Sequence, residues 1–184
     1  GAARGQGRSH ALTFAREGAD IVASDICHDL PCPNYPNGTR EELDETVEGV
    51  RKLGRRAIAM ETDVRNAGQM EAMVAKAIEE FGKIDILINN AGFLQMAMPH
   101  EITEEQWDIT YDTMVKGIWL GCKYVIPHMM TQNSGVILST ASGGALTGFG
   151  FMCHYVAAKH GVLGLTRALA VELAPWNIRV NCVC

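Results

Sequence analysis

The sequence lacks the features of a membrane-spanning protein and of a nucleic-acid-binding protein. No apolar run approaches the roughly 18 to 20 residues that a helix needs to cross a bilayer. Basic residues are in the minority, because 16 lysines and arginines stand against 21 aspartates and glutamates, for a net charge of −5. We therefore expect neither a membrane nor a nucleic acid as a partner.

The chain also lacks the paired cysteine spacing of a zinc site. Its six cysteines include no C-x-x-C pair and have no suitably spaced histidines beside them, so no metal site is expected. Free buried thiols in a reducing cytoplasm are the simpler interpretation, which predicts a cytoplasmic location. The cysteines are Cys27, Cys32, Cys122, Cys153, Cys182 and Cys184.

Length and composition instead describe one soluble domain. Apolar residues make up 47% of the 184 residues and charged residues 20%, which is ordinary for a globular protein with a substantial core. The chain has no repeat and no linker, which predicts a single domain over residues 1–184. Because it begins with a glycine inside a motif and ends inside a strand pattern, we expect it to be a fragment of a longer chain.

Short apolar runs alternate with longer segments of helical periodicity. The runs are almost continuously apolar, as parallel strands covered on both faces are. This alternation predicts right-handed βαβ units and a doubly wound, three-layer α/β fold of the Rossmann type with a parallel sheet. The expected strands are residues 19–24, 56–60, 84–88, 135–139 and 178–183, and the expected helices are 9–17, 41–53, 70–81, 105–130 and 154–173.

One connection is longer than the others. Residues 26–39 hold three of the six prolines. A strand-to-helix connection usually takes about two to six residues. This loop is therefore either functional or a tolerated insertion.

A tyrosine and a lysine four residues apart, Tyr155 and Lys159, form the most informative pair in the sequence. On a helix this spacing places the phenol and the ammonium on one face, where the cation favours the phenolate. Ser142 lies thirteen residues upstream and offers a hydroxyl to hold a substrate oxygen. The three residues describe a proton-transfer site for an alcohol and a carbonyl, although the pair alone also fits an ordinary contact on a helix surface.

The opening residues indicate a dinucleotide site. Gly1, Gly5 and Gly7 precede a helix, and such glycines let the backbone approach a pyrophosphate at the helix N-terminus. Asp25 ends the next strand, where a carboxylate accepts hydrogen bonds from an adenosine ribose and repels a 2′-phosphate. Asp25 therefore favours NAD over NADP, although Arg4 points weakly toward a phosphate.

Two further turns follow predicted strands and fit the same ligand. Asp63 and Val64 form the first, where the carboxylate could meet the adenine amino group; an ordinary helix N-cap is the alternative. Asn90, Ala91 and Gly92 form the second, where small residues allow close backbone approach. All these features lie at strand carboxyl ends, where open α/β sheets bind ligands.

In this order, the motifs resemble those of the short-chain dehydrogenase/reductase family over the whole chain. Residues 1–10, Asp25, the long loop and residues 154–161 are more narrowly similar to its mycofactocin-coupled, carveol-dehydrogenase-like branch. The resemblance implies an NAD-dependent oxidoreductase that interconverts a secondary alcohol and a ketone. It also implies that the long loop covers a tightly held NAD and that a mycofactocin-type acceptor takes the electrons.

The resemblance implies a role for each matching residue. Tyr155 is the general acid and base, Lys159 favours its phenolate and binds the nicotinamide ribose, and Ser142 holds the substrate oxygen. Ser139 and Thr140 are nearby hydroxyls, but the spacing to Tyr155 selects Ser142. The residues expected to bind the cofactor are Gly1, Arg4, Gly5, Gly7, Asp25, Asp63, Val64, Asn90, Ala91, Gly92, Tyr155 and Lys159.

One position departs from the family pattern. The family places an asparagine three residues before a glycine of the central helix, where it orders a water of the proton relay. Here the glycine is Gly117 and the aligned residue is Met114, which has no group fit to order that water. The relay then takes another path, or catalysis is slowed, or the protein is a catalytically weak dinucleotide-binding sensor or scaffold.

The remaining expectations also come from the resemblance. The family has a strand in mid-sheet before the glycine turn, and a substrate lid and a final strand after the last expected strand. Its long helices, here around 107–130 and 154–173, pack between subunits, usually in homotetramers. Five apolar residues near the expected site suggest a fairly apolar alcohol or ketone: Leu94, Met96, Met98, Phe149 and Met152. The alternative is that several of them belong to the core.

Overall fold

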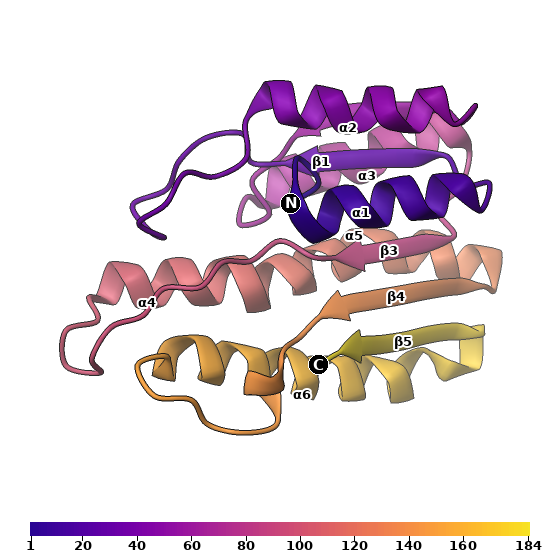
Figure 1. Ribbon diagram of the computed structural model, residues 1–184. Helices are drawn as coiled ribbons and strands as arrows, with labels where there is room; N and C mark the ends of the chain where they lie inside the picture. Colours follow the sequence, from indigo (N-terminus) through magenta and orange to yellow (C-terminus); the bar gives the residue numbers. More distant parts are fainter.

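A computed structural model describes residues 1–184 (Figure 1). Its strands are parallel, and their carboxyl ends lie at one edge of the molecule, on the left in Figure 1. β1 pairs with β2, and β4 lies between β3 and β5. The strands are β1 Ile21–Asp25, β2 Ala57–Glu61, β3 Ile86–Asn89, β4 Gly135–Thr140 and β5 Ile178–Val183.

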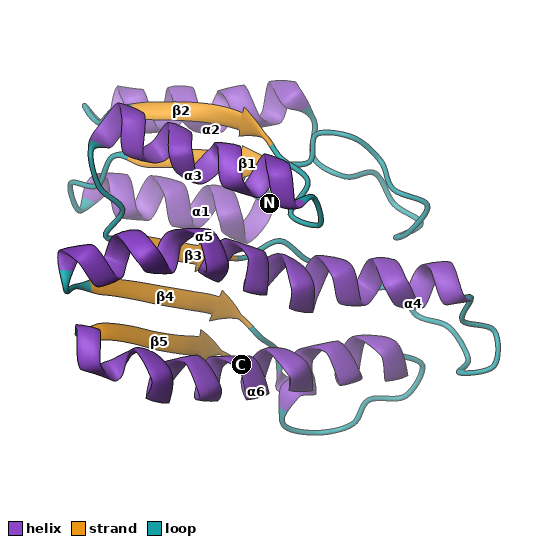
Figure 2. Ribbon diagram, turned by 180° about the vertical axis from the view of Figure 1, so that it is seen from behind, coloured by secondary structure: helices purple, strands orange, loops and turns teal.

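Helices cover both faces of the strands. α1 and α2 lie on one face, and α3, α5 and α6 lie on the other, as the two opposite views show (Figures 1 and 2). The predicted doubly wound α/β arrangement is therefore confirmed. The helices are α1 Gly5–Arg16, α2 Arg40–Lys52, α3 Ala67–Phe81, α4 Glu104–Tyr111, α5 Gly117–Gln132 and α6 Cys153–Leu173. None of them is both long and apolar enough to cross a membrane.

The expected central helix over residues 105–130 is interrupted. Residues Asp112–Lys116 form a π-turn between α4 and α5, closed by a hydrogen bond from the Gly117 N–H to the Asp112 carbonyl. One widened turn hardly changes the spacing of apolar residues, so periodicity alone does not detect it. Such turns often occur at functional sites.

Side-chain caps explain where three helices begin. Thr39 caps α2 and Thr103 caps α4, each in a reciprocal pair with the residue three positions on. Asn66 caps α3. The alternative that Asp63 serves as an N-cap is therefore wrong.

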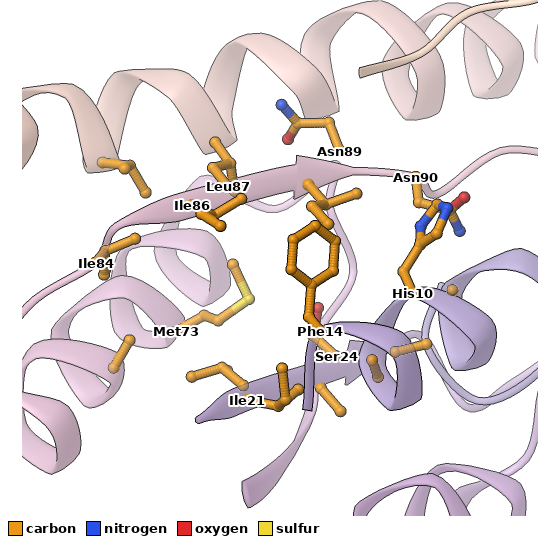
Figure 3. Close-up of a pocket in the computed structure, with 18 of the residues that line it drawn as sticks. His10, Phe14, Ile21, Ser24, Met73, Ile84, Ile86, Leu87, Asn89 and Asn90 are labelled. Atoms are coloured by element: carbon orange, nitrogen blue, oxygen red, sulfur yellow. The ribbon is translucent and has the colours of Figure 1, made fainter. Parts of the chain in front are cut away.

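Two apolar clusters form the core, one on each side of a cavity. One cluster joins α1 and α2 to β1 and β2, and the other joins α5 and α6 to β4 and β5. Between them, the strands β1 and β3, which do not pair with each other, border a cavity of about 450 Å³. Phe14, Met73 and Ile21 are among the side chains that point into it (Figure 3). A parallel strand placed there would join the two groups of strands into one sheet.

All six cysteines are free, as predicted, but only Cys32 and Cys122 are buried. Burial raises the pKa of the Cys122 thiol to about 11, which keeps it protonated and unreactive. Cys153 and Cys184 are exposed.

Candidate functional site

The glycine-rich turn lies at the carboxyl end of β1, where the Ala2 N–H donates to the Ser24 carbonyl at 2.9 Å. A Cβ atom at Gly7 would lie 1.8 Å from the Gly1 carbonyl oxygen, so only glycine fits there unless the turn moves. The first turn of α1 has neither a side-chain cap nor an acidic residue. Its free N–H groups and the positive end of the helix dipole therefore form a site for an anion.

Asp25 lies buried beneath this turn, with 6% of its surface exposed. Its carboxylate accepts the Ala3 N–H at 2.9 Å. A Cβ atom at Gly38 would lie 3.2 Å from the same carboxylate, so the long loop passes directly over it. The structure thus brings Asp25, the glycine turn and the loop together.

The long loop, residues 26–39, bridges two parts of this edge. The Arg4 guanidinium donates to the Pro36 carbonyl, which ties the loop to the glycine turn. The Tyr35 hydroxyl accepts the Leu94 N–H at 3.2 Å, which ties the loop to the segment after β3. The Arg4 guanidinium therefore already has a hydrogen-bond partner in the loop, which argues against a role in binding a 2′-phosphate.

A chain of hydrogen bonds connects the glycine turn to α6. The Asn90 amide donates to the Gly1 carbonyl at 3.2 Å and accepts the Thr140 hydroxyl at 3.2 Å. The Thr140 carbonyl in turn accepts the Lys159 ammonium at 2.7 Å. The two sites that the sequence predicts separately are thus linked through the ends of β3 and β4.

Ser142 and Tyr155 come together beside Gly144, and Lys159 lies beside the Tyr155 ring. A Cβ atom at Gly144 would lie 3.4 Å from the Ser142 hydroxyl oxygen and 3.5 Å from the Tyr155 ring. The Lys159 Nζ atom lies 5.6 Å from the centre of that ring. Tyr155 and Lys159 share one face of α6, as their spacing predicts.

The Lys159 ammonium is almost completely enclosed, with 4% of the residue exposed. It forms no ion pair, and burial lowers its pKa to about 8. At neutral pH it is still protonated, so it presents a positive charge to the neighbouring phenol.

Comparison with known proteins agrees with this geometry. The family described as short chain dehydrogenase matches residues 1–184. The chain belongs to the short-chain dehydrogenase/reductase family. A (−)-trans-carveol dehydrogenase of Rhodococcus erythropolis is 43% identical over 183 residues, which are 98% of this chain and 66% of the relative.

Solved structures of the family are equally similar. The carveol dehydrogenase of Mycobacterium avium in complex with NAD superposes with a TM-score of 0.96 at 42% identity, over 99% of this chain and 66% of that one. A short-chain dehydrogenase of Mycobacterium paratuberculosis bound to NAD also gives 0.96, at 38% identity, over 99% and 68% of the two chains. The chain thus spans about two thirds of the length of these relatives.

Among the hydroxyls that the family pattern left as alternatives, Ser142 is the one that lies with the Tyr155 ring at Gly144. Ser139 is 1% exposed and lies 3.5 Å from the Asn89 amide. The Thr140 hydroxyl is held by Asn90. The Ser142 oxygen accepts only the Gly144 N–H, at 3.0 Å, which leaves its own proton free for another acceptor.

Asp63 and Val64, which the sequence predicts to contact the adenine, already have neighbours within the chain. The Asp63 carboxylate forms a forked pair with Arg65, with the shortest distance 2.7 Å. Partial burial raises the pKa of Asp63, but the Arg65 hydrogen bonds outweigh it and leave the pKa below its usual value. Val64 packs against the helix at Gly117, 2.8 Å from where a Cβ atom would lie. Asp63 therefore already has a partner within the chain.

Sequence reasoning missed two residues that organise the site. Thr140 was considered only as a hydroxyl, whereas its carbonyl holds Lys159. Gly144 is the second, because its Cα lies between Ser142 and the Tyr155 ring, each within ordinary contact distance of a Cβ placed there. A glycine two residues after the serine was a signal available in the sequence.

Proposed function

We propose that the chain is the cofactor-binding and catalytic part of an NAD-dependent oxidoreductase that interconverts a secondary alcohol and a ketone. The observation that carries this proposal is the meeting of Ser142 and Tyr155 at Gly144, with the Lys159 ammonium beside the phenol ring. The similarity to the carveol dehydrogenase of Rhodococcus erythropolis and the NAD in the Mycobacterium complexes support it.

The residues present fit NAD. The uncapped start of α1 offers N–H groups to a pyrophosphate, and Asp25 offers a carboxylate to a ribose where a 2′-phosphate would be repelled. Gly1, Gly5 and Gly7 would line the pyrophosphate, Val64 and Asp63 the adenine, and Asn90, Ala91 and Gly92 the adjoining ribose. When bound, NAD supplies the acceptor and donor of the hydride.

Ser142, Tyr155 and Lys159 have different roles in the proton transfer. During oxidation, the Ser142 hydroxyl donates a hydrogen bond to the alcohol oxygen, and the Tyr155 phenolate takes the proton of that alcohol. Lys159 stabilises the phenolate through its charge. In reduction Tyr155 returns the proton to the carbonyl oxygen.

The substrate side of the site is apolar. The Phe149 ring lies 3.6 Å from the Cβ position of Gly144, beside the catalytic hydroxyls. The Phe151 carbonyl accepts the Ala97 N–H at 2.9 Å, which joins the loops after β3 and β4 into one wall. Four of the five apolar side chains predicted near the site are exposed rather than core, namely Leu94, Met96, Met98 and Phe149. We infer a substrate with an apolar body.

Partner and assembly follow from the same family membership. A homotetramer formed through α5 and α6 agrees with exposed apolar side chains on these helices, with Trp119 46% and Val171 78% exposed. A mycofactocin-type acceptor agrees with a loop fastened over Asp25 by Arg4 and Tyr35. Stoichiometric NAD released on denaturation, with little turnover on added NAD, would support the trapped cofactor.

A second candidate is a dinucleotide-binding protein with little catalysis, because Met114 occupies the relay position and is buried. Incubation of the full-length protein with a panel of secondary alcohols and an artificial electron acceptor separates the two. Mass spectrometry should detect the ketone, and Ser142→Ala should reduce its rate. NAD binding without ketone from any alcohol would favour the second candidate.

A further inference from the structure

Lys159 has an unusual set of neighbours for a charged group. Its ammonium carries three N–H donors, yet its one hydrogen-bond acceptor within the protein is the Thr140 carbonyl. No carboxylate lies within ion-pair distance. A buried ammonium with so few partners would normally attract water.

The side chain that closes this space is Met114. It stands in the π-turn between α4 and α5 and is 1% exposed. A Cβ atom at Gly92 would lie 3.6 Å from the Met114 sulfur and 3.8 Å from the Lys159 Nζ atom. The thioether and the ammonium therefore border the same small volume beside Gly92.

We propose that Met114 is a positioning residue that excludes water from the Lys159 ammonium and thereby holds it on the Thr140 carbonyl, beside the Tyr155 ring. A thioether is a weak hydrogen-bond acceptor, so it fills the volume without solvating the charge. The functional consequence rests on the proposed function, because Lys159 acts there on Tyr155.

The electrostatics around Lys159 agree with this role. The pKa of Lys159 is lowered to about 8, and burial is the cause. The charged residues of the π-turn, Asp112 and Lys116, pair with each other at 3.3 Å and are partly exposed. β4 and the turn at Gly92 contain no titratable residue, and on α6 the Tyr155 ring centre lies 5.6 Å from the ammonium.

The test is a pH titration of the lysine Nζ resonances of the full-length protein by NMR, with Lys159 assigned through Lys159→Arg. Met114→Leu keeps the volume apolar and is the matched control for Met114→Gln, which places an amide of similar length there. In Met114→Gln we expect the pKa of Lys159 to rise by about one unit, as one hydrogen bond to a charged group warrants. In Met114→Leu it should stay near the wild-type value.

A pKa of Lys159 that is the same in the Leu and Gln variants would overturn the proposal. If the Gln variant does not fold, exchange of the Lys159 ammonium protons with water in the wild-type protein decides. Slow exchange supports a dry ammonium, and exchange as fast as that of an exposed lysine contradicts it. Neither readout needs turnover, so a failure of the proposed alcohol oxidation is distinguished from a failure of this inference. Where turnover is present, its alkaline decline should move upward with the pKa of Lys159.

Discussion

Single glycines impose the strictest steric constraints on the turn that precedes α1. At Gly7 a Cβ atom would collide with backbone, whereas at Gly164, exposed on α6, it would meet nothing within 4 Å. We expect Gly7→Ala to destabilise the protein by about 1–3 kcal/mol and to weaken NAD binding. Gly164→Ala should stabilise α6 by about 0.5–1 kcal/mol and leave NAD affinity unchanged. Urea unfolding and calorimetric titration with NAD measure both, and an unimpaired Gly7→Ala protein would refute the steric argument.

Phe149 offers a second test at the residue scale. Its ring lies beside Ser142 and Tyr155, so it should contact the body of the substrate rather than the reacting oxygen. Phe149→Ala should reduce kcat/KM about 10- to 200-fold for bulky apolar alcohols, the range typical of lost apolar contacts. A small alcohol such as 2-propanol should be affected little. An equal loss for small and bulky alcohols would indicate general disruption of the site instead.

The identity of site residues could be read from the sequence where it depends on local spacing. Tyr155 and Lys159 are four apart on one helix, and Asp25 stands at the end of a strand. Contacts made only in three dimensions could not be read in the same way. The bond from Lys159 to the Thr140 carbonyl, which joins α6 to β4, belongs to this group.

At the scale of elements, the long loop after β1, residues 26–39, is held in place by hydrogen bonds to other segments. Two neighbouring loop residues fasten it, because the Pro36 carbonyl accepts from Arg4 and the Tyr35 hydroxyl accepts the Leu94 N–H. If the loop covers NAD, Tyr35→Phe should accelerate NAD release several-fold, because it removes one hydrogen bond worth about 1 kcal/mol. Arg16→Ala, on the last turn of α1, serves as a control without contact to the loop. Stopped-flow measurement of NAD dissociation decides, and an unchanged rate would show that the loop does not limit release.

The secondary structure was largely predictable, since apolar periodicity marks each strand and helix. The π-turn was not, because Asp112–Lys116 keeps helical spacing while changing the backbone bonds. That turn places Met114 beside Gly92 and Lys159. The sequence identified Met114 as a departure from the family pattern, and the structure shows its neighbours.

At the scale of the whole molecule, the gap between β1 and β3 divides the strands into two groups. The Gly1 amine donates to the Ser24 carbonyl at 2.8 Å, so a strand preceding Gly1 would run alongside β1 into the cavity. An added apolar strand should raise the free energy of unfolding by several kcal/mol, because each buried large apolar side chain contributes roughly 1.5–3 kcal/mol. Urea unfolding should be measured for this chain, for the chain with an added N-terminal apolar strand, and for a control in which the added strand carries aspartates at alternate positions. Equal free energies of unfolding for all three chains would show that an added strand does not fill the cavity.

The most direct test of the central claim follows hydrogen from the substrate carbon. With a secondary alcohol deuterated at the carbinol carbon, the wild-type protein should yield the ketone and NADH carrying one deuterium. Tyr155→Phe should slow this transfer by at least about 100-fold, the usual contribution of a general base, while the protein still binds NAD. Deuterium transfer at the wild-type rate in Tyr155→Phe, or none in the wild type with NAD bound, would contradict the account.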